Sequence, residues 1–409
     1  MSKPLNYKEG CMRSKPLQML VLLCAVILMA GQWACGSKAL KKESVLDTPD
    51  NHFSIGMRRL DSGNIAEAKQ EFMRAKQLDP KYPEADAGLG LAYAYEGNID
   101  QAMKAVDDAL GKNDKSVESR IIKGRILSMR VASLQGDEGK NQDKIADLTK
   151  DAVNEFDRAL KLNPNSDKAH FYKAEAYKTA YQFGPAAEAY SKVIALKGEF
   201  AGRADAGYAT MQKIQRAAPG TKIGMKIALI PEIDRADLAV LLLEELKLEE
   251  VFKKKQQPNF DTGFQAPADP TKMEQPKAAE LPAATDIETH WAKNWIKDII
   301  RIGGMEAFPD HTFQPDMKIT RANYATTMQS ILVAVTGDKA LTTKYIGGQS
   351  RFPDMRSDHF SYNAAALMAD RGIMNADKIT GAFNPEGHMS GADALLVIRD
   401  FQNALRITF

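Results

Sequence analysis

The pattern of apolar and polar residues divides this chain of 409 residues into segments of different character. Residues 19–30 form one uninterrupted apolar run of 12 residues. A membrane-spanning helix needs about 20 apolar residues, so this run is too short to cross a bilayer. Basic residues precede it and small residues follow it, as in a secretory signal peptide. We therefore expect residues 1–34 to be a cleaved leader, with Met12 as an alternative translation start to Met1.

From residue 49 onward, small residues recur with a fixed spacing. Gly56, Gly63, Ala68 and Ala75 each have an identical residue 34 positions later. Small side chains at such positions let paired helices approach closely, and larger residues such as Phe72 fill the space between neighbours. One helix pair cannot bury its apolar face alone, but three or more stacked pairs can. The pattern therefore predicts a stack of antiparallel helix pairs.

The third and fourth copies of this pattern are less regular. The interval from Gly124 to Ala152 is 28 residues, whereas the corresponding interval in the first two copies is 12. We therefore expect 16 extra residues between the helices of the third copy, near residues 135–144. A long loop in a compact array needs a reason, so this insertion is a candidate for a specific contact. A fourth copy near 167–200 precedes a predicted capping helix over 204–217.

The 34-residue period, with these residue types, resembles the tetratricopeptide repeat. The resemblance covers residues 49–200 and implies an α-solenoid of four repeats whose concave groove holds a segment of a protein partner. Every residue of the repeat pattern is expected to be core and identifies no partner. The groove is expected to be lined by other side chains of the first helices, for example Arg59, Asp86, Lys123 and Lys173.

The chain changes character again after residue 252. Residues 253–285 contain five prolines among lysine, glutamine, alanine and glutamate residues. Such a composition cannot build a core and predicts a linker. Two further units follow, over residues 286–340 and 350–405. Residues 201–252, before the linker, are expected to hold the capping helix and part of a third such unit.

The first of these units carries three short motifs in a fixed order. They are HWA at 290–292, FPDHTFQP at 308–315 and ITRA at 319–322. Their order and spacing resemble an S-layer homology repeat. The second unit repeats the order more loosely and ends on Met-Ser-Gly at 389–391, and Ile-Asp-Arg at 233–235 resembles the second half of a degenerate copy. The resemblance covers about 219–405 and implies a mostly helical module that packs three repeats around a pseudo-threefold axis and binds cell-wall polymer.

The resemblance also implies a binding site at the start of the second helix of each repeat. Thr320 can cap that helix with its hydroxyl, and a helix N-terminus offers N–H groups and partial positive charge to an anion. Arg321 adds a planar guanidinium that can hold a carboxylate with two hydrogen bonds. Arg235, capped by Asp234, would act in the same way. In the last copy Ser390 keeps the cap, but a glycine replaces the arginine.

An aromatic residue is a further candidate, because Trp291 could stack on a sugar ring. The glycan-binding residues that we predict are therefore Thr320, Arg321, Arg235, Asp234, Trp291 and Ser390. Two alternatives stay open. Arg321 could instead form a salt bridge that ties two repeats together, and Trp291 could belong to the core.

The apolar leader ends at Gln-Trp-Ala-Cys-Gly, residues 32–36. This ending resembles a bacterial lipoprotein signal, which implies that Cys35 is lipidated and becomes the first residue of the mature protein. Residues 35–48 would then be a tether that spans at most about 50 Å. The alternative is an ordinary signal peptide with an incidental cysteine.

Composition and spacing argue against several classes of function. Without the four basic residues and one acidic residue of the leader, 51 basic and 52 acidic residues remain, so no nucleic-acid partner is expected. No cysteine lies beyond residue 35, and the six histidines have no metal-ligand spacing. No nucleophile motif or nucleotide-binding loop is present in the sequence. We therefore predict no catalytic residues, no cofactor and no metal site.

Together these features predict an all-α, non-catalytic lipoprotein that is exported to the outer membrane of a diderm bacterium and faces the periplasm. It would anchor to peptidoglycan or an attached glycan and hold an unidentified protein partner in its repeat groove, with the membrane as a further partner through the lipid. One alternative is an assembly or secretion adaptor in which the C-terminal module is only structural. Another is an accessory protein or weak enzyme that acts on cell-wall glycan.

Overall fold

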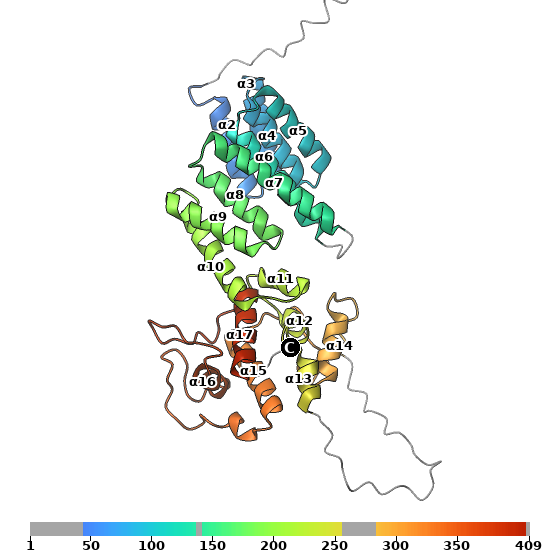
Figure 1. Ribbon diagram of the computed structural model, residues 1–409, viewed down its shortest axis with the longest axis vertical. Helices are drawn as coiled ribbons and strands as arrows, with labels where there is room; N and C mark the ends of the chain where they lie inside the picture. Colours follow the sequence, from blue (N-terminus) through green and yellow to red (C-terminus); the bar gives the residue numbers. More distant parts are fainter. Residues whose placement is uncertain (1–43, 136–140, 256–283, 406–409) are drawn as a thin grey trace, which may run out of the picture. The chain divides into compact units, whose positions relative to one another are not determined.

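The structure, a computed structural model, describes residues 44–135, 141–255 and 284–405. Cys35, most of the predicted tether and most of the predicted linker lie outside these residues. The described part is all-α, as expected, and its β-pairing is limited to two isolated bridges. These residues form two compact units, which divide between Pro164 and Asn165 (Figure 1).

The first unit contains three helix pairs in which each helix packs against the next along the chain. Gly63 and Gly97 have positive φ angles of 78° and 83° in the turns of the first two pairs, a conformation that favours glycine and explains why glycine recurs there. The pairs are α2 (Pro49–Asp61) with α3 (Ile65–Leu78), α4 (Pro83–Tyr95) with α5 (Ile99–Lys112), and α6 (Val117–Leu134) with α7 (Gln142–Leu162).

Aromatic rings of the second helices rest on glycines of the first helices. A β-carbon at Gly56 would lie 2.5 Å from the ring of Phe72, and one at Gly88 would lie 2.6 Å from the same ring. Gly124 has the same relation to Phe156, at 2.6 Å. Both rings are completely buried. The small residues of the repeat therefore permit the close helix packing that the sequence pattern predicted.

The third pair differs from the first two in length. Helices α6 and α7 contain 18 and 21 residues, whereas α4 and α5 contain 13 and 14. Most of the 16 inserted residues therefore extend these two helices instead of forming the long loop that we expected, since α6 ends at Leu134 and α7 begins at Gln142. The wrong expectation arose because a polar stretch can equally form the exposed turns of a long helix.

The second unit has one continuous hydrophobic core, which runs from the fourth helix pair to the C-terminal helices. Helix α10 packs against α9 on one side and against α17 on another (Figure 1). The elements are α8 (Asp167–Thr179), α9 (Phe183–Leu196), α10 (Ala201–Ala217), α11 (Lys222–Ala228), α12 (Arg235–Glu244), α13 (Leu248–Lys255), α14 (Lys293–Arg301), α15 (Arg321–Thr336), the 3₁₀ helix η3 (Lys339–Thr342), α16 (Tyr362–Asp370) and α17 (Gly391–Ala404).

Candidate functional site

Three backbone hydrogen bonds form a closed ring at the centre of the C-terminal module. Ile233 N donates to Met389 O at 2.9 Å, Met389 N donates to Ile319 O at 2.9 Å, and Ile319 N donates to Ile233 O at 3.0 Å. All three residues are buried, and each lies two positions before the first residue of α12, α15 or α17. The segments at 233–235, 319–321 and 389–391 are therefore equivalent around a pseudo-threefold axis.

The residue after each ring position caps the following helix. Asp234, Thr320 and Ser390 each accept a hydrogen bond from the backbone N–H three residues later, at 3.0, 3.2 and 3.1 Å. In the first copy Asp237 returns a bond to the backbone N–H of Asp234, which completes a capping box. The three residues therefore act as N-caps, as expected, and their predicted role toward glycan stays a prediction.

The first N–H groups of these helices are not open to an anion. In α12, Arg235 N donates to Met317 O and Ala236 N donates to Pro315 O, both at 3.0 Å. In α15, Arg321 N donates to Gly387 O at 2.8 Å, and the next N–H is bonded in the same way. The expectation of a helix N-terminus with free N–H groups is therefore wrong for α12 and α15, because the turn of the next repeat supplies the acceptors.

The two arginine side chains join successive repeats. Arg321 Nε donates to Phe383 O at 2.7 Å and its Nη2 donates to Asn375 O at 2.9 Å. Arg235 makes the same two bonds one repeat earlier, to Phe313 O at 2.8 Å and Glu306 O at 2.9 Å. Each guanidinium also lies within 4.8 Å of a phenylalanine ring centroid. Burial lowers the pKa of both groups.

Arg321 thus ties two repeats together, as in the salt-bridge alternative, but its acceptors are backbone carbonyls rather than a carboxylate. An arginine cannot occupy the third equivalent position, because even a β-carbon at Gly391 would overlap the carbonyl oxygen of Ile227. The loss of the arginine in the last copy is therefore explained by a close approach of two backbones.

A groove with a volume of about 320 Å³ lies between the repeats, and we call it the first groove. Arg235 and Phe360, which precedes α16, are among its lining residues. The remaining lining residues are Gly303, Gly304, Met305, Glu306, Ile319, Asn323, Thr326, Thr327 and Ser330.

The wall of the first groove on α15 is polar. Asn323, Thr326, Thr327 and Ser330 follow the i, i+3, i+4, i+7 spacing of one helix face, on a helix whose buried residues are apolar. The three hydroxyls donate to carbonyls of their own helix, so they can accept hydrogen bonds from sugar hydroxyls. This polar stripe is visible in the sequence but was not among the predicted site residues.

Two aromatic side chains are exposed at equivalent places in the last two repeats. Trp291 is 53% exposed and Phe360 is 74% exposed. Each follows a histidine whose Nδ1 accepts the backbone N–H two residues later, from Ala292 at 3.2 Å and from Ser361 at 3.3 Å. The core alternative for Trp291 is therefore wrong, and sequence analysis did not select Phe360 although it aligns with Trp291.

Side chains that we expected to line the groove of the helical repeats are engaged in ion pairs. Asp86 is only 5% exposed and pairs with Lys76 at 2.7 Å and with Lys112. Lys123 pairs with Asp107 at 2.8 Å. The expectation that Asp86 faces a partner is therefore wrong, because its carboxylate joins helices of neighbouring repeats.

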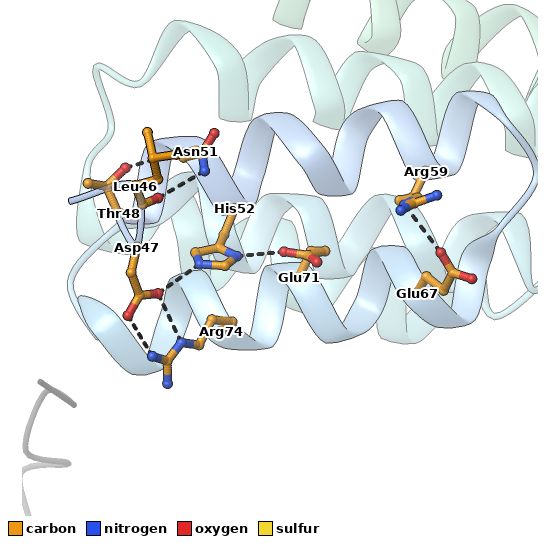
Figure 2. Close-up of polar contacts among 9 residues, drawn as sticks. All are labelled: Leu46, Asp47, Thr48, Asn51, His52, Arg59, Glu67, Glu71 and Arg74. Carbon is orange, nitrogen blue, oxygen red and sulfur yellow. Dashed lines mark hydrogen bonds and ion pairs between the residues drawn. The ribbon is translucent and has the colours of Figure 1, made fainter. Parts of the chain in front are cut away.

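Arg59 is likewise paired, with Glu67 at 3.2 Å (Figure 2). Lys173, in the second unit, lies 5.9 Å from the ring centroid of Tyr177. These two contacts are compatible with a place on an exposed face.

The segment that leads into α2 is fixed by a charged cluster (Figure 2). The buried carboxylate of Asp47 accepts two hydrogen bonds from Arg74, at 2.6 and 3.1 Å, and lies 2.8 Å from His52 Nε2. His52 Nδ1 lies 2.5 Å from Glu71. Burial opposes the charged imidazole, but the hydrogen bonds to Glu71 and Asp47 prevail and raise the pKa of His52.

Two kinds of feature are absent from the described residues. Residues 44–135, 141–255 and 284–405 hold no helix that is long and apolar enough to cross a bilayer. The same residues contain no cluster of three or more histidine, cysteine, aspartate or glutamate side chains that could hold a metal ion.

Comparison with known protein families gives two matches. A family model for the tetratricopeptide repeat matches residues 59–125, and one for the S-layer homology domain matches residues 351–395. A segment of 55 residues is 40% identical to Cell surface glycoprotein 1 of Acetivibrio thermocellus. That segment is 13% of this chain and only 2% of the glycoprotein.

Solved structures of two proteins are similar to part of this chain. A thermophilic TPR protein of Thermus thermophilus is 15% identical, with a TM-score of 0.35, over 48% of this chain and 91% of that one. Pseudomonas aeruginosa pilF is 17% identical, with a TM-score of 0.22, over 42% of this chain and 93% of that one. The family matches are thus the evidence that the chain combines tetratricopeptide repeats with an S-layer homology domain, which indicates protein interaction and a place in the cell envelope.

Proposed function

We propose that this chain, which carries tetratricopeptide repeats and an S-layer homology domain, is a non-catalytic anchor between cell-wall glycan and a protein partner. The first groove is the observation that supports this proposal most directly. It combines a cation at Arg235, an exposed ring at Phe360 and a stripe of hydroxyl and amide groups on α15. Such a set can stack on a sugar ring, bond its hydroxyls and attract an acidic substituent.

The role of each predicted residue changes accordingly. Arg235 and Arg321 hold the repeats in register through backbone carbonyls, so in our proposal their contact with glycan is secondary. Trp291, exposed at the place equivalent to Phe360, offers a second ring for stacking. Thr320, Asp234 and Ser390 act through the helix caps that shape the module.

The N-terminal part of the proposal is a lipid anchor on Cys35 in an outer membrane, with the module facing the periplasm. Asp47 is the first described residue that is firmly held by side chains of the repeats. The 12 residue steps from Cys35 to Asp47 would then span at most about 40 Å. The helical repeats, which begin within that distance of the membrane, would hold an unidentified protein.

The arginine contacts also favour a second candidate function. Because both guanidinium groups are committed to carbonyls within the module, the module could serve only as a structural platform. The chain would then be an assembly or secretion adaptor that acts through its helical repeats. This function requires no binding to the cell wall.

Sedimentation with isolated cell-wall sacculi separates the two functions. The full chain should pellet with sacculi, and Phe360→Ala should weaken binding about 3- to 10-fold, as expected for one lost stacking contact. Ser330→Trp, which fills the first groove, should abolish pelleting. Ile379→Ala is the matched control, because Ile379 is 94% exposed and does not line the groove.

The outcomes are distinct. A wild-type chain that stays in the supernatant contradicts the anchor and leaves the adaptor. A wild-type chain that pellets together with both groove variants supports the anchor but contradicts the assignment of the first groove. For the lipid, a Cys35→Ser variant that still partitions into detergent contradicts acylation of Cys35.

A further inference from the structure

The pseudo-threefold axis assigns a counterpart to every residue of the first groove. Arg235 corresponds to Arg321, and Glu306 corresponds to Asn375, because Arg235 Nη2 donates to Glu306 O just as Arg321 Nη2 donates to Asn375 O. On the helices, Asn323 and Ser330 of α15 correspond to Asp393 and Asp400 of α17, counted from the N-caps. These counterparts define a second groove, which begins at Arg321 and runs along α17.

Helix α10 occupies the place where a ligand of the second groove would lie. It packs against α17, and Lys213 Nζ forms an ion pair with Asp393 Oδ1 at 2.7 Å. Two turns further along α17, burial raises the pKa of Asp400, and the positive charge of Arg216 only partly offsets this rise. Of the two carboxylates that replace neutral side chains of the first groove, Asp393 is therefore the one paired with a basic residue of α10.

The end of α10 also stands where the exposed aromatic of the other repeats stands. Trp291 and Phe360 lie 12 positions before Gly303 and Gly372, and each of these glycines comes two positions after the last residue of the first helix. The equivalent position after α11 is Ile230, and the residue 12 positions before it is Ala218. Arg399 of α17 donates to the carbonyls of Ala217 and Ala218 at 3.2 and 3.3 Å, which fixes this end of α10.

Both burial and charge indicate that α10 is packed on α17. Met211, Ile214 and Ala217 of α10 are buried, and they belong to the same hydrophobic core as α17. A helix that presents apolar residues together with a cation is complementary to an apolar surface that carries a carboxylate. The matching of opposite charges selects this helix rather than a neutral or acidic segment.

We propose that α10 is a built-in occupant of the second groove, held there by the ion pair of Lys213 with Asp393 and by its buried apolar residues. The groove serves as an intramolecular joint that binds the last helical repeat to the cell-wall module. Of these two grooves, the intact chain consequently presents only the first to glycan. This last consequence rests on the proposed wall-binding function, whereas the joint itself does not.

Hydrogen exchange on the full-length chain tests the joint. Lys213→Glu places a carboxylate beside Asp393 and should accelerate amide exchange in residues 211–217 by about 3- to 10-fold, as expected for a partly exposed pair turned into a repulsive one. Adding Asp393→Lys restores opposite charges and should return exchange to the wild-type rate. Lysine keeps the backbone N–H at 393 that bonds Ser390, and the bond that the Ser390 hydroxyl donates to Asp393 Oδ2 at 2.6 Å is lost in the double variant. Lys192→Glu, an exposed lysine of α9, is the matched control.

Two results would overturn the joint: exchange in Lys213→Glu that does not differ from the control, or exchange that stays fast in the double variant. Titration with glycan strands that an amidase has released from sacculi tests the second part. A strand site that appears in Lys213→Glu but not in the wild type supports a closed second groove, and equal numbers of sites in the two proteins contradict it. If no strand binds, the proposed wall-binding function fails, while the exchange data still decide the joint.

Discussion

At the scale of single residues, the helical repeats depend on glycines against which aromatic rings pack. Phe72 lies against Gly56 and Gly88, and a β-carbon at Gly207 of α10 would lie 2.7 Å from the ring of Tyr190 of α9. An added methyl group has no space unless the ring moves. Packing, rather than turn geometry, therefore fixes glycine at these helical positions.

Gly56→Ala should destabilise the first unit although alanine is the better helix former. Overpacking against Phe72 is expected to cost about 1–3 kcal/mol, more than the gain in helix propensity of roughly 1 kcal/mol. Gly111→Ala is the control, because no atom lies within 4 Å of its added carbon, and it should be neutral or stabilising. Thermal unfolding followed by circular dichroism measures both, and equal effects of the two substitutions would contradict the packing argument.

The His52 cluster predicts a stability that depends on pH. Because Asp47 and Glu71 raise the pKa of His52 above its ordinary value of 6.5, the folded state favours the charged imidazole, and Arg74 completes the cluster. This contribution is fully present below about pH 6.5 and is lost as the pH rises through the folded-state value.

The stability gap between the wild type and His52→Gln should therefore be largest below about pH 6.5 and should narrow toward pH 8.5. Hydrogen exchange in residues 49–61, corrected for its intrinsic pH dependence, measures this gap. A gap that widens with rising pH would show that His52 acts as a neutral side chain.

At the scale of elements, the turns of the last two repeats are held by one carboxylate each. Asp286 accepts the N–H groups of Phe313 and Gln314 at 2.8 and 2.7 Å, and Asp354 accepts the equivalent pair in the last repeat at 2.9 and 2.6 Å. The second residue of each pair has a positive φ angle, 53° at Gln314 and 56° at Asn384. The carboxylate thus holds a backbone conformation that these residues adopt only at a cost.

Asp354→Ala should destabilise the last repeat by about 1–3 kcal/mol, because two hydrogen bonds to a charged acceptor are lost and the turn is released. Asp358→Ala is the control, since that exposed carboxylate pairs with Arg356 only two residues away. Chemical denaturation of both variants measures the difference. Similar midpoints would mean that packing around Phe383 holds the turn without Asp354.

At the scale of the whole molecule, the boundary between compact units falls inside the predicted tetratricopeptide array. Helices α8 and α9 share the hydrophobic core of the C-terminal module, to which α10 connects them. Tyr190 of α9 covers α10 at Gly207. A fragment cut just before α10 would therefore expose part of this core.

A fragment of residues 201–409 should accordingly unfold at a lower temperature than a fragment of residues 165–409, by several degrees for a loss of about 2–3 kcal/mol. Thermal unfolding of both fragments, with binding of a hydrophobic dye as a second measurement, checks this prediction. Equal unfolding temperatures would show that the C-terminal module is complete without the fourth helix pair.

The sequence by itself determined the features that depend on neighbours along the chain. The 34-residue period predicted helix pairs, and the caps Asp234, Thr320 and Ser390 were placed correctly, since cap chemistry acts over three residues. The order of motifs after residue 286 predicted equivalent repeats, because that order can be compared along the chain without knowledge of distant contacts.

Only the tertiary structure decided what each of these equivalent positions does. Arg235 and Arg321 end on carbonyls 71 to 78 and 54 to 62 residues away, and α10 reaches α17 across more than 170 positions of sequence. Local patterns cannot specify which face of a repeat another segment covers. One sequence motif therefore forms an open groove beside α15 and an occupied one beside α17, because packing of distant segments, not local propensity, sets exposure.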